Sequence, residues 1–301
     1  MQDLGTYLEA GHLLIADGAI GTMLQSMGLP AGIALELWNV DNPNAVRTLH
    51  RAHLDAGSQV ILTNTFGGNR IKLDRGGGLG DRVHELNRVA VALAKEEATG
   101  RAYVAADIGP TGELMAPLGS LEHSRAVEVY AEQVQVVDEA GVDLVWIETM
   151  SDLDEAAAAI EGAGKATDLP IFCSLSFGRA GKTMMGVSPR LAVQVLWPLG
   201  LTAIGGNCGE GVEVMTLVLS EMRTALAELG GTRRPVLIAK PNAGLPQLRD
   251  GVTVFDLGPE DLAAQVPGFV ELGAQVLGAC CGSSPGHIAA IASLCRERLL
   301  L

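Results

Sequence analysis

Short apolar runs alternate with longer amphipathic segments from one end of this chain to the other. Each run spans five to seven residues and is rich in Val, Ile, Leu and Ala, which is typical of a buried strand. Between the runs, apolar residues recur at the spacing of a helix that buries one face. We expect strands at residues 13–17, 59–64, 103–109, 144–149, 171–177, 203–208, 236–240 and 276–280. We expect helices at residues 43–56, 81–98, 124–140, 152–164, from 189, 213–229, 259–272 and from 285.

Eight strand–helix units constrain the fold class to α/β. Strands that are apolar along nearly their whole length indicate a parallel sheet covered by helices on both faces. Eight such units within 301 residues favour a closed (β/α)₈ barrel of the TIM type, and a doubly wound open sheet is the alternative. No linker, low-complexity segment or shift in composition marks a second domain. We therefore expect residues 1–301 to form one barrel domain.

A barrel of this type makes a prediction about where functional groups lie. Its active site is built where the strands end, at the carboxyl-terminal face. Nine polar or thiol side chains occupy such strand ends: Asp17, Asn64, Thr65, Asp107, Glu148, Cys208, Asn242, Cys280 and Cys281. Only one strand separates the sixth from the eighth, so the three cysteines in this set can meet across the barrel mouth.

These three cysteines predict a metal site. Cys280 and Cys281 are adjacent and therefore too close for a relaxed disulfide, and Cys208 ends another strand. Three thiolates suit a soft tetrahedral ion such as Zn²⁺, and three protein ligands leave one position open for chemistry. The alternative is that the adjacent pair are merely small buried side chains. Cys173 and Cys295 are expected in the core, and no histidine is expected to bind the metal.

The chemistry of such a site favours alkyl transfer to a thiol. Three thiolates give the ion's site a formal charge of about −1, which makes it a weak catalyst of hydrolysis. A thiol entering the fourth position loses its proton and stays nucleophilic. If that thiol carries an amino-acid head, it needs a carboxylate and amide donors. Asp17-Gly18-Ala19 offers both, and Glu148 is a further partner for an ammonium.

Net charge and the N-terminal sequence limit the kinds of partner and the cellular compartment that we expect. The chain has 35 acidic and 21 basic residues, a net charge of −14, which disfavours binding to nucleic acid or to an anionic membrane. Residues 1–6 lack the basic and apolar regions of a signal peptide, and no apolar run reaches the roughly 20 residues of a membrane span. Five cysteines without a disulfide pattern fit a reducing compartment. We expect a cytoplasmic protein.

Seven motifs at or near the expected strand ends form a recognisable set. They are Asp17-Gly-Ala-Ile-Gly-Thr22, Thr63-Asn-Thr-Phe-Gly67, Asp107-Ile-Gly-Pro-Thr-Gly112, Glu148-Thr149, Gly206-Asn-Cys208, Pro241-Asn-Ala-Gly244 and Gly278-Ala-Cys-Cys-Gly282. Together they resemble the homocysteine S-methyltransferase domain family, most closely the homocysteine-binding module of cobalamin-dependent methionine synthase. The resemblance covers essentially the whole chain.

The resemblance implies a function and a role for each matched residue. It implies methyl transfer to a thiol, most readily homocysteine, to give methionine. It implies one Zn²⁺ per chain on Cys208, Cys280 and Cys281, which together form the catalytic centre, with the homocysteine thiolate as fourth ligand. Asp17, Gly18 and Glu148 would hold the amino-acid end of this substrate. A further hypothesis is that Asn242 supplies a carbonyl oxygen to zinc while substrate is absent, and the alternative is that it is an ordinary turn asparagine.

The methyl donor is left open by the sequence. The 301 residues contain no folate, cobalamin or reactivation module. The methyl group could therefore come from methylcobalamin on a separate corrinoid protein, from betaine or from S-methylmethionine.

Lys240, which precedes Pro241, stands where an acidic residue is common in the methionine synthase module, and such a change could alter the acceptor thiol. Two other interpretations remain: a barrel lyase whose Lys240 forms a Schiff base, with its pKa lowered by apolar neighbours, and a non-catalytic docking subunit for a corrinoid protein.

Overall fold

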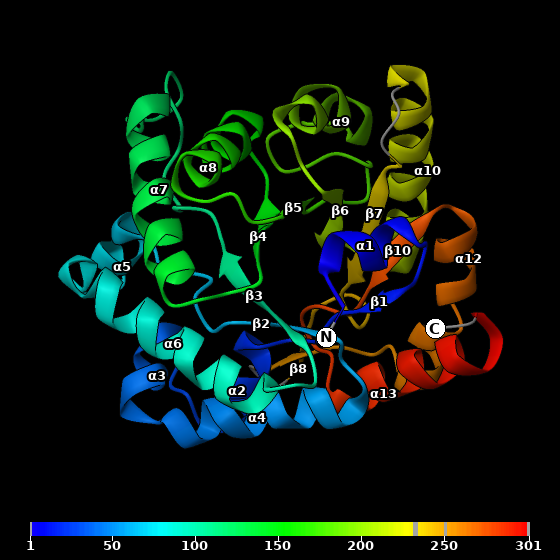
Figure 1. Ribbon diagram of the computed structural model, residues 1–301, viewed down its shortest axis with the longest axis horizontal. Helices are drawn as coiled ribbons and strands as arrows, with labels where there is room; N and C mark the ends of the chain where they lie inside the picture. Colours follow the sequence, from blue (N-terminus) through cyan, green and yellow to red (C-terminus); the bar gives the residue numbers. More distant parts are fainter. Residues whose placement is uncertain (1, 231–233, 250–251, 300–301) are drawn as a thin grey trace.

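The computed structural model describes residues 2–230, 234–249 and 252–299 (Figure 1). Within these ranges, eight parallel strands form one sheet in the order β1-β10-β7-β6-β5-β4-β3-β2. The strands are β1 (Leu14–Ile15), β2 (Val60–Leu62), β3 (Tyr103–Ile108), β4 (Leu144–Met150), β5 (Ile171–Leu175), β6 (Ala203–Cys208), β7 (Val236–Pro241) and β10 (Ala274–Leu277).

The two edges of this sheet meet. β1 pairs with β10 on one side, and on the other side Ala16 forms a bridge with Val60 of β2. The amide of Gln59 also donates to the carbonyl of Ile15, 2.7 Å away. The sheet is therefore closed, which confirms the predicted (β/α)₈ barrel and excludes the doubly wound open sheet.

Helices surround the barrel on its outside (Figure 1). The α-helices are α1 (Leu4–Glu9), α2 (Gly21–Ser26), α3 (Trp38–Asp41), α4 (Pro43–Ala56), α5 (Arg70–Arg75), α6 (Val83–Ala98), α7 (His123–Glu139), α8 (Leu153–Ala166), α9 (Pro189–Leu196), α10 (Val212–Leu229), α11 (Pro259–Ala263), α12 (Val266–Glu271) and α13 (Pro285–Leu294). Shorter turns are the 3₁₀ segments Leu35–Leu37, Gly80–Arg82 and Trp197–Leu199, and the π-helical segment Cys295–Leu299. The outer apolar faces of the strands are thereby covered.

Local sequence signals account for where several helices begin and end. Ser188 caps α9 by accepting from the amide of Leu191, and Pro189 opens the helix, as its fixed φ allows. The single helix predicted over 259–272 is wrong, because the chain forms α11 and α12 instead. Pro267 lies in the first turn of α12, where a missing amide is tolerated; inside one continuous helix it would break the hydrogen-bond ladder.

The barrel interior is apolar at one end and polar at the other. Trp146 and Phe172 are fully buried inside it, and Leu4 and Leu8 of α1 join the same cluster. Because side chains two residues apart on a strand point to the same face, Glu148 follows Trp146 towards the carboxyl ends of the strands. The charged side chains of the barrel interior therefore lie at the carboxyl ends of the strands.

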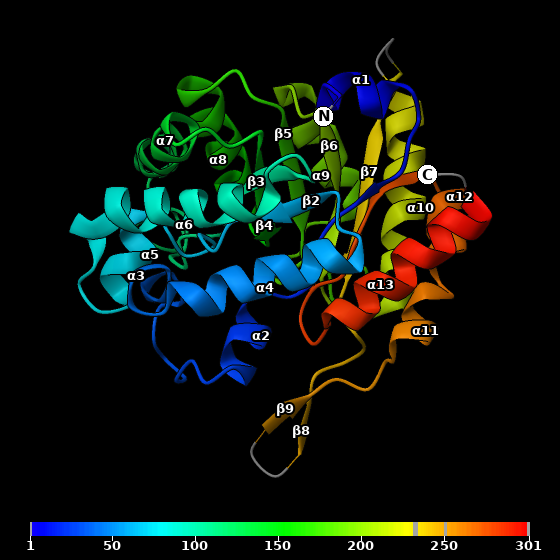
Figure 2. The ribbon, with the colours of Figure 1, turned by 60° about the horizontal axis from the view of Figure 1, so that its bottom comes forward.

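A hairpin that the sequence patterns did not predict follows β7. It consists of β8 (Gln247–Arg249) and β9 (Val252–Val254) and projects from the barrel on the side opposite α1 (Figure 2). Phe255, just after it, packs so closely on Gly282 that an added Cβ there would lie 2.1 Å from the ring. A glycine is therefore required at this contact. Among the described helices, none has the length and apolar character needed to cross a membrane.

Candidate thiol and metal site

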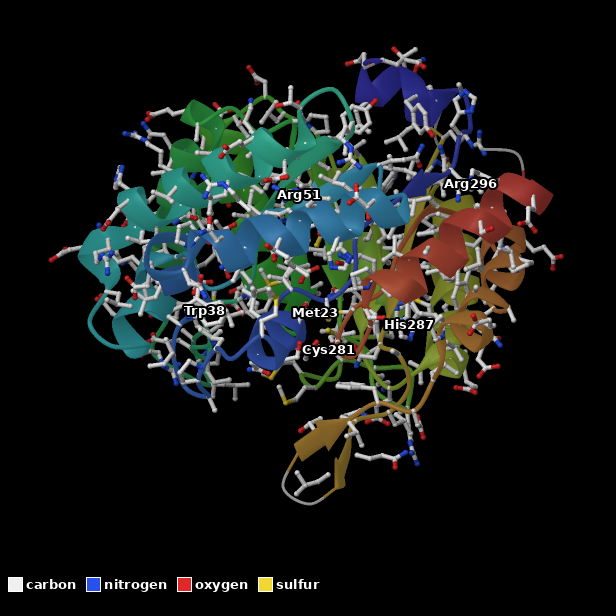
Figure 3. All side chains as sticks on the ribbon, turned by 90° about the horizontal axis from the view of Figure 1, so that it is seen from below. Met23, Trp38, Arg51, Cys281, His287 and Arg296 are labelled. Atoms are coloured by element: carbon white, nitrogen blue, oxygen red, sulfur yellow. The ribbon has the colours of Figure 1, made fainter. Side chains whose placement is uncertain are left out.

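A cavity of about 300 Å³ lies at the carboxyl ends of the strands. It is lined by Gly18, Ala19, Ile20, Gly21, Thr22, Gln25, Leu35, Leu62, Asn64, Phe66, Asp107, Glu148, Thr149, Cys208, Lys240, Cys280 and Cys281. Figure 3 shows Cys281 near Met23 of α2 and His287 of α13, on the side of the barrel from which the hairpin projects. The cavity lies at the end of the barrel where the sequence placed the site.

The three predicted cysteines converge in this cavity. The Sγ atom of Cys208 lies 2.6 Å from that of Cys280 and 3.8 Å from that of Cys281, and all three sulfurs lie within 4.8 Å of one another. All three are free thiols. In the described part of the chain, no other set of three or more Cys, His, Asp or Glu residues has this metal-ligand geometry. Cys173 is buried within β5, as predicted.

The sulfur positions fit a tetrahedral ion. Thiolates about 2.3 Å from Zn²⁺ lie about 3.8 Å from one another, which is the Cys208–Cys281 separation. The Cys208–Cys280 pair would need to open by about 1.2 Å. Hydrogen bonds from Cys208 and Cys280 to the thiolate of Cys281 also lower the pKa of Cys281, so one sulfur of the cluster is ready to ionise.

An unusual backbone conformation presents Cys208 to the cavity. Cys208 and Thr149 have positive φ values of 53° and 61°, a region that side chains other than glycine rarely adopt. Gly209 follows with φ 72°, and an added Cβ there would lie 2.4 Å from the carbonyl oxygen of Phe177. The chain thus turns sharply after β6, and this turn directs the Cys208 thiol inward.

Asn207 holds these two turns together. Its Oδ1 atom accepts from the amide of Thr149 and from Ser174 Oγ, both at 2.8 Å, and its Nδ2 atom donates to Thr149 Oγ1 at 2.7 Å. Nδ2 also lies 3.8 Å from Cys280 Sγ. Asn207 is 1% exposed. The motif analysis included Asn207 but gave it no role, because its partners lie on strands far away in sequence.

Two backbone hydrogen bonds hold the Cys280–Cys281 turn against the end of β7 and the residues that follow it. The Cys280 amide donates to the carbonyl of Pro241 at 2.8 Å, and the Ala243 amide donates to the carbonyl of Cys281 at 3.0 Å. Asn242, between them, donates from Nδ2 to the carbonyl of Gly209 at 2.9 Å. Its buried Oδ1 has no hydrogen-bond partner among the described residues. Asn242 therefore lies between the two cysteine turns with an unused oxygen.

Both carboxylate oxygens of Asp17 accept hydrogen bonds from groups of the protein itself. Its Oδ2 atom accepts from the amide of Leu62 at 2.8 Å, and its Oδ1 atom accepts from Lys240 Nζ at 3.1 Å. Asp17 is fully buried and is not among the described residues that line the cavity. Its ion-pair partner Lys240 does line the cavity.

Lys240 is a buried ammonium. Its Nζ lies 3.9 Å from Glu148 Oε2 and 4.9 Å from the centre of the Trp146 ring, a cation–π contact. Burial alone would lower the pKa of Lys240, but Asp17 and Glu148 outweigh it and hold the pKa above its ordinary value. The expectation that apolar neighbours lower this pKa is wrong, because the sequence did not reveal the carboxylates. A protonated amine is not nucleophilic, so the Schiff-base interpretation loses its basis.

Two further carboxylates face the cavity. Asp107 and Glu148 are 3% and 7% exposed, and within the described ranges Asp107 Oδ1 and Glu148 Oε2 have no hydrogen-bond partner. Burial, reinforced by the charge of Glu148, raises the pKa of Asp107 well above its usual range. Burial likewise raises the pKa of Glu148 to about 8, although Lys240 acts in the opposite direction. Both groups would gain from a positively charged partner.

Gly18 lines the cavity beside the cysteines. An added Cβ on Gly18 would lie 2.7 Å from Ser283 Oγ and 2.9 Å from His53 Cε1, so only glycine fits. The next amide, that of Ala19, already donates to Ser283 Oγ at 2.9 Å. Ser283 is a supporting residue that the motif analysis did not select. It lies just beyond the cysteine pair and ties the Gly18 turn to it.

Comparison with known proteins decides the family. The family model described as homocysteine S-methyltransferase matches residues 14–295. The chain belongs to the homocysteine S-methyltransferase family. Two curated relatives are the methionine synthases of Mycobacterium tuberculosis (strain ATCC 25618 / H37Rv) and Mycobacterium leprae (strain TN). Each is 30% identical to this chain, over 300 and 302 residues respectively. Both alignments cover 94% of this chain and 24% of the relative, so the chain spans about a quarter of their length.

A solved structure supports the fold of this homocysteine S-methyltransferase family member. The metallated form of the homocysteine methyltransferase MmuM from Escherichia coli superimposes with a TM-score of 0.78 at 23% sequence identity. The match covers 97% of this chain and 99% of MmuM. At this identity the likeness establishes the shared barrel architecture.

Proposed function

We propose that this protein is a zinc-dependent S-methyltransferase that transfers a methyl group to homocysteine and so produces methionine. The observation that carries the proposal is the convergence of three free thiols in one cavity at the carboxyl ends of the barrel strands. Family membership supports the same reaction. We also propose that residues 1–301 act as one catalytic module.

Cys208, Cys280 and Cys281 are the residues that would hold the zinc ion. When bound, the ion supplies an open fourth position at which the acceptor thiol loses its proton and remains nucleophilic. The unpartnered Oδ1 of Asn242 lies between the two cysteine turns, which supports the idea that this oxygen occupies the fourth position before the acceptor arrives.

The rest of the cavity would orient the acceptor. Glu148 provides a buried carboxylate for its ammonium, and Gly18 lets its amino-acid end approach the backbone. Asp17 belongs to the same region through its ion pair with Lys240. In the transfer itself, the acceptor sulfur forms a bond to the methyl carbon while the bond from that carbon to the donor breaks. The donor leaves with the electron pair, and the thiol proton has already passed to solvent.

The methyl donor would be a small molecule or a protein-bound cofactor. Betaine, S-methylmethionine and methylcobalamin on a separate corrinoid protein are the three candidates. The alignment with the two methionine synthases covers 24% of the length of each. Free thiols of this kind persist in a reducing compartment, so we propose a cytoplasmic location.

The decisive experiment is a methionine assay with the three donors tested separately. Zinc-loaded protein is incubated with homocysteine and each donor, and methionine is measured. Formation of methionine from at least one donor is expected, and Cys281→Ala should abolish it. Cys173→Ala is the matched control, because that sulfur is buried within β5 away from the cluster. Turnover by metal-free protein, or by Cys281→Ala at the rate of the control, would contradict the mechanism.

A further inference from the structure

A circuit of hydrogen bonds begins and ends beside the cysteine pair. The carbonyl of Cys281 accepts from the amide of Ala243 at 3.0 Å, and the carbonyl of Ala243 accepts from the amide of Leu257 at 3.1 Å. The carbonyl of Leu257 lies 2.9 Å from Nε2 of His287, whose Nδ1 atom lies 3.0 Å from the amide of Ser284. The circuit therefore joins the cysteine turn, the loop after β7 and the segment that follows the β8–β9 hairpin.

The imidazole of His287 closes this circuit, whereas the links from Cys281 to Leu257 are made by backbone groups. His287 is 7% exposed and lies on α13, on the same side of the barrel as Cys281 (Figure 3). A carbonyl oxygen can only accept, so Nε2 carries a proton and donates to Leu257, while Nδ1 accepts from Ser284. A substitution at this one position can therefore open the circuit and leave its backbone groups in place.

Packing joins the same three segments. The ring of Phe255 lies directly against Gly282, the residue after the cysteine pair. On the other side, an added Cβ on Gly244 would lie 2.5 Å from Asp256 Oδ1. Residues 255–257 therefore contact both the cysteine turn and the loop after β7, and the bond from His287 holds them there.

The circuit acts on a turn that has little stiffness of its own. Gly278 and Gly282 flank the cysteine pair, and Gly282 has a φ of 79°, which few other residues adopt. Contacts from outside the turn must therefore hold its two sulfurs in place. Groups that hold metal ligands without touching the metal typically change metal affinity about 10- to 100-fold when they are removed.

We propose that His287 is a positioning residue for the zinc-binding turn. By donating to the carbonyl of Leu257, it holds residues 255–257 against Cys281 and against the loop that carries Asn242. The inference rests on the proposed function, because zinc on the cysteines is part of that function. The competing role is purely local, since His287 and Ser284 also form a capping box at the start of α13.

Two amide substitutions separate the two roles. The side-chain oxygen in His287→Gln and in His287→Asn can accept from the amide of Ser284, so both variants keep the helix cap. Only the longer Gln can also reach the carbonyl of Leu257 with a donor. The two variants thus differ in the link to Leu257. His84→Asn is the matched control, because the His84 side chain is 62% exposed on α6, away from the cysteine turn.

The measurements concern the metal and need no methyl transfer. Competition between zinc-loaded protein and a chelator gives the zinc affinity, and the absorption spectrum of cobalt(II)-loaded protein reports the arrangement of the three sulfurs. His287→Asn should bind zinc about tenfold more weakly than the wild type, and its thiolate-to-cobalt absorption should change. His287→Gln and His84→Asn should stay within about threefold of the wild-type affinity and keep its spectrum.

Several results would overturn the inference. One is a wild-type zinc affinity and cobalt spectrum in His287→Asn, and another is equal weakening of zinc binding in the two amide variants, which would leave only the helix cap. Should His287→Asn not fold, His287→Gln still decides, because a folded Gln variant that binds zinc more than about tenfold less tightly than the wild type contradicts the role of the Leu257 link.

The inference and the proposed function fail in different ways. A protein whose zinc affinity depends on His287 as expected, but which makes methionine from none of the donors, supports the inference and overturns the proposed function. Methionine formation together with an unchanged zinc site in His287→Asn does the reverse. A wild-type protein that binds no zinc overturns both.

Discussion

Asn207→Ala tests whether the cysteine site depends on the side-chain amide of Asn207, which links β6 to β4 and β5. Asn207 of β6 links the Thr149 turn after Glu148, Ser174 of β5, and the backbone that carries Cys208. The substitution keeps the Cβ atom and removes the whole hydrogen-bonding group. Its direct effect is therefore the loss of these bonds inside a buried environment.

The expected loss of stability follows from the number of bonds. Three hydrogen bonds of 2.7–2.8 Å disappear, and the amide of Thr149 and the hydroxyl of Ser174 lose an acceptor. At about 1 kcal/mol for each bond, the free energy of unfolding should fall by about 3 kcal/mol. Cys208 should also lose its fixed orientation, and removal of such a supporting group typically weakens metal binding about 10- to 100-fold.

Two measurements check this prediction. Urea denaturation of the metal-free protein gives the free energy of unfolding, and competition with a chelator gives the zinc affinity. Asn44→Ala is the matched control, because Asn44 is exposed and should change stability by less than about 0.5 kcal/mol. If Asn207→Ala loses less than about 1 kcal/mol and binds zinc like the wild type, the reasoning about this network is refuted.

Three further changes have defined outcomes. Gly18→Ala places a Cβ 2.7 Å from Ser283 Oγ, so calorimetry should show homocysteine affinity at least fivefold lower; unchanged affinity would mean that the Gly18 turn moves freely. Gly282→Ala clashes with Phe255 at a φ of 79° and should lower the thermal midpoint in a melting experiment, whereas an unchanged midpoint would contradict that contact. Because the pKa of Glu148 rises from 4.5 to about 8 on folding, the unfolded chain releases this proton first, and the stability of the metal-free protein should fall as pH rises through that window. Glu148→Gln should remove this part of the pH dependence in denaturation measured at pH 5, 6, 7 and 8, and an identical pH profile would refute the assignment.

The sequence predicted the barrel because its strands are marked by local composition. Runs such as residues 144–147 are apolar and fully buried, and their period differs plainly from that of the helices around them. The same logic placed Cys208, Cys280 and Cys281 at one end of the barrel, since parallel strands of a barrel all end at one face.

What the sequence did not predict depends on contacts between distant segments. The ion pair of Lys240 with Asp17 joins residues 223 positions apart, so no local pattern could reveal that the lysine is charged and that the carboxylate is already paired. The bonds of Asn207 likewise cross from β6 to β4 and β5. The β8–β9 hairpin has only three residues on each strand, too few for a periodic signal.

The central claim is that three sulfurs hold one catalytic zinc ion, and metal analysis tests it most directly. Purified wild-type protein and Cys173→Ala should each contain about one zinc per chain, since three-thiolate sites bind a single ion. Cys208→Ala should contain almost none, and its solutions should give no methionine from homocysteine with any donor. A full complement of zinc in Cys208→Ala would contradict the claim.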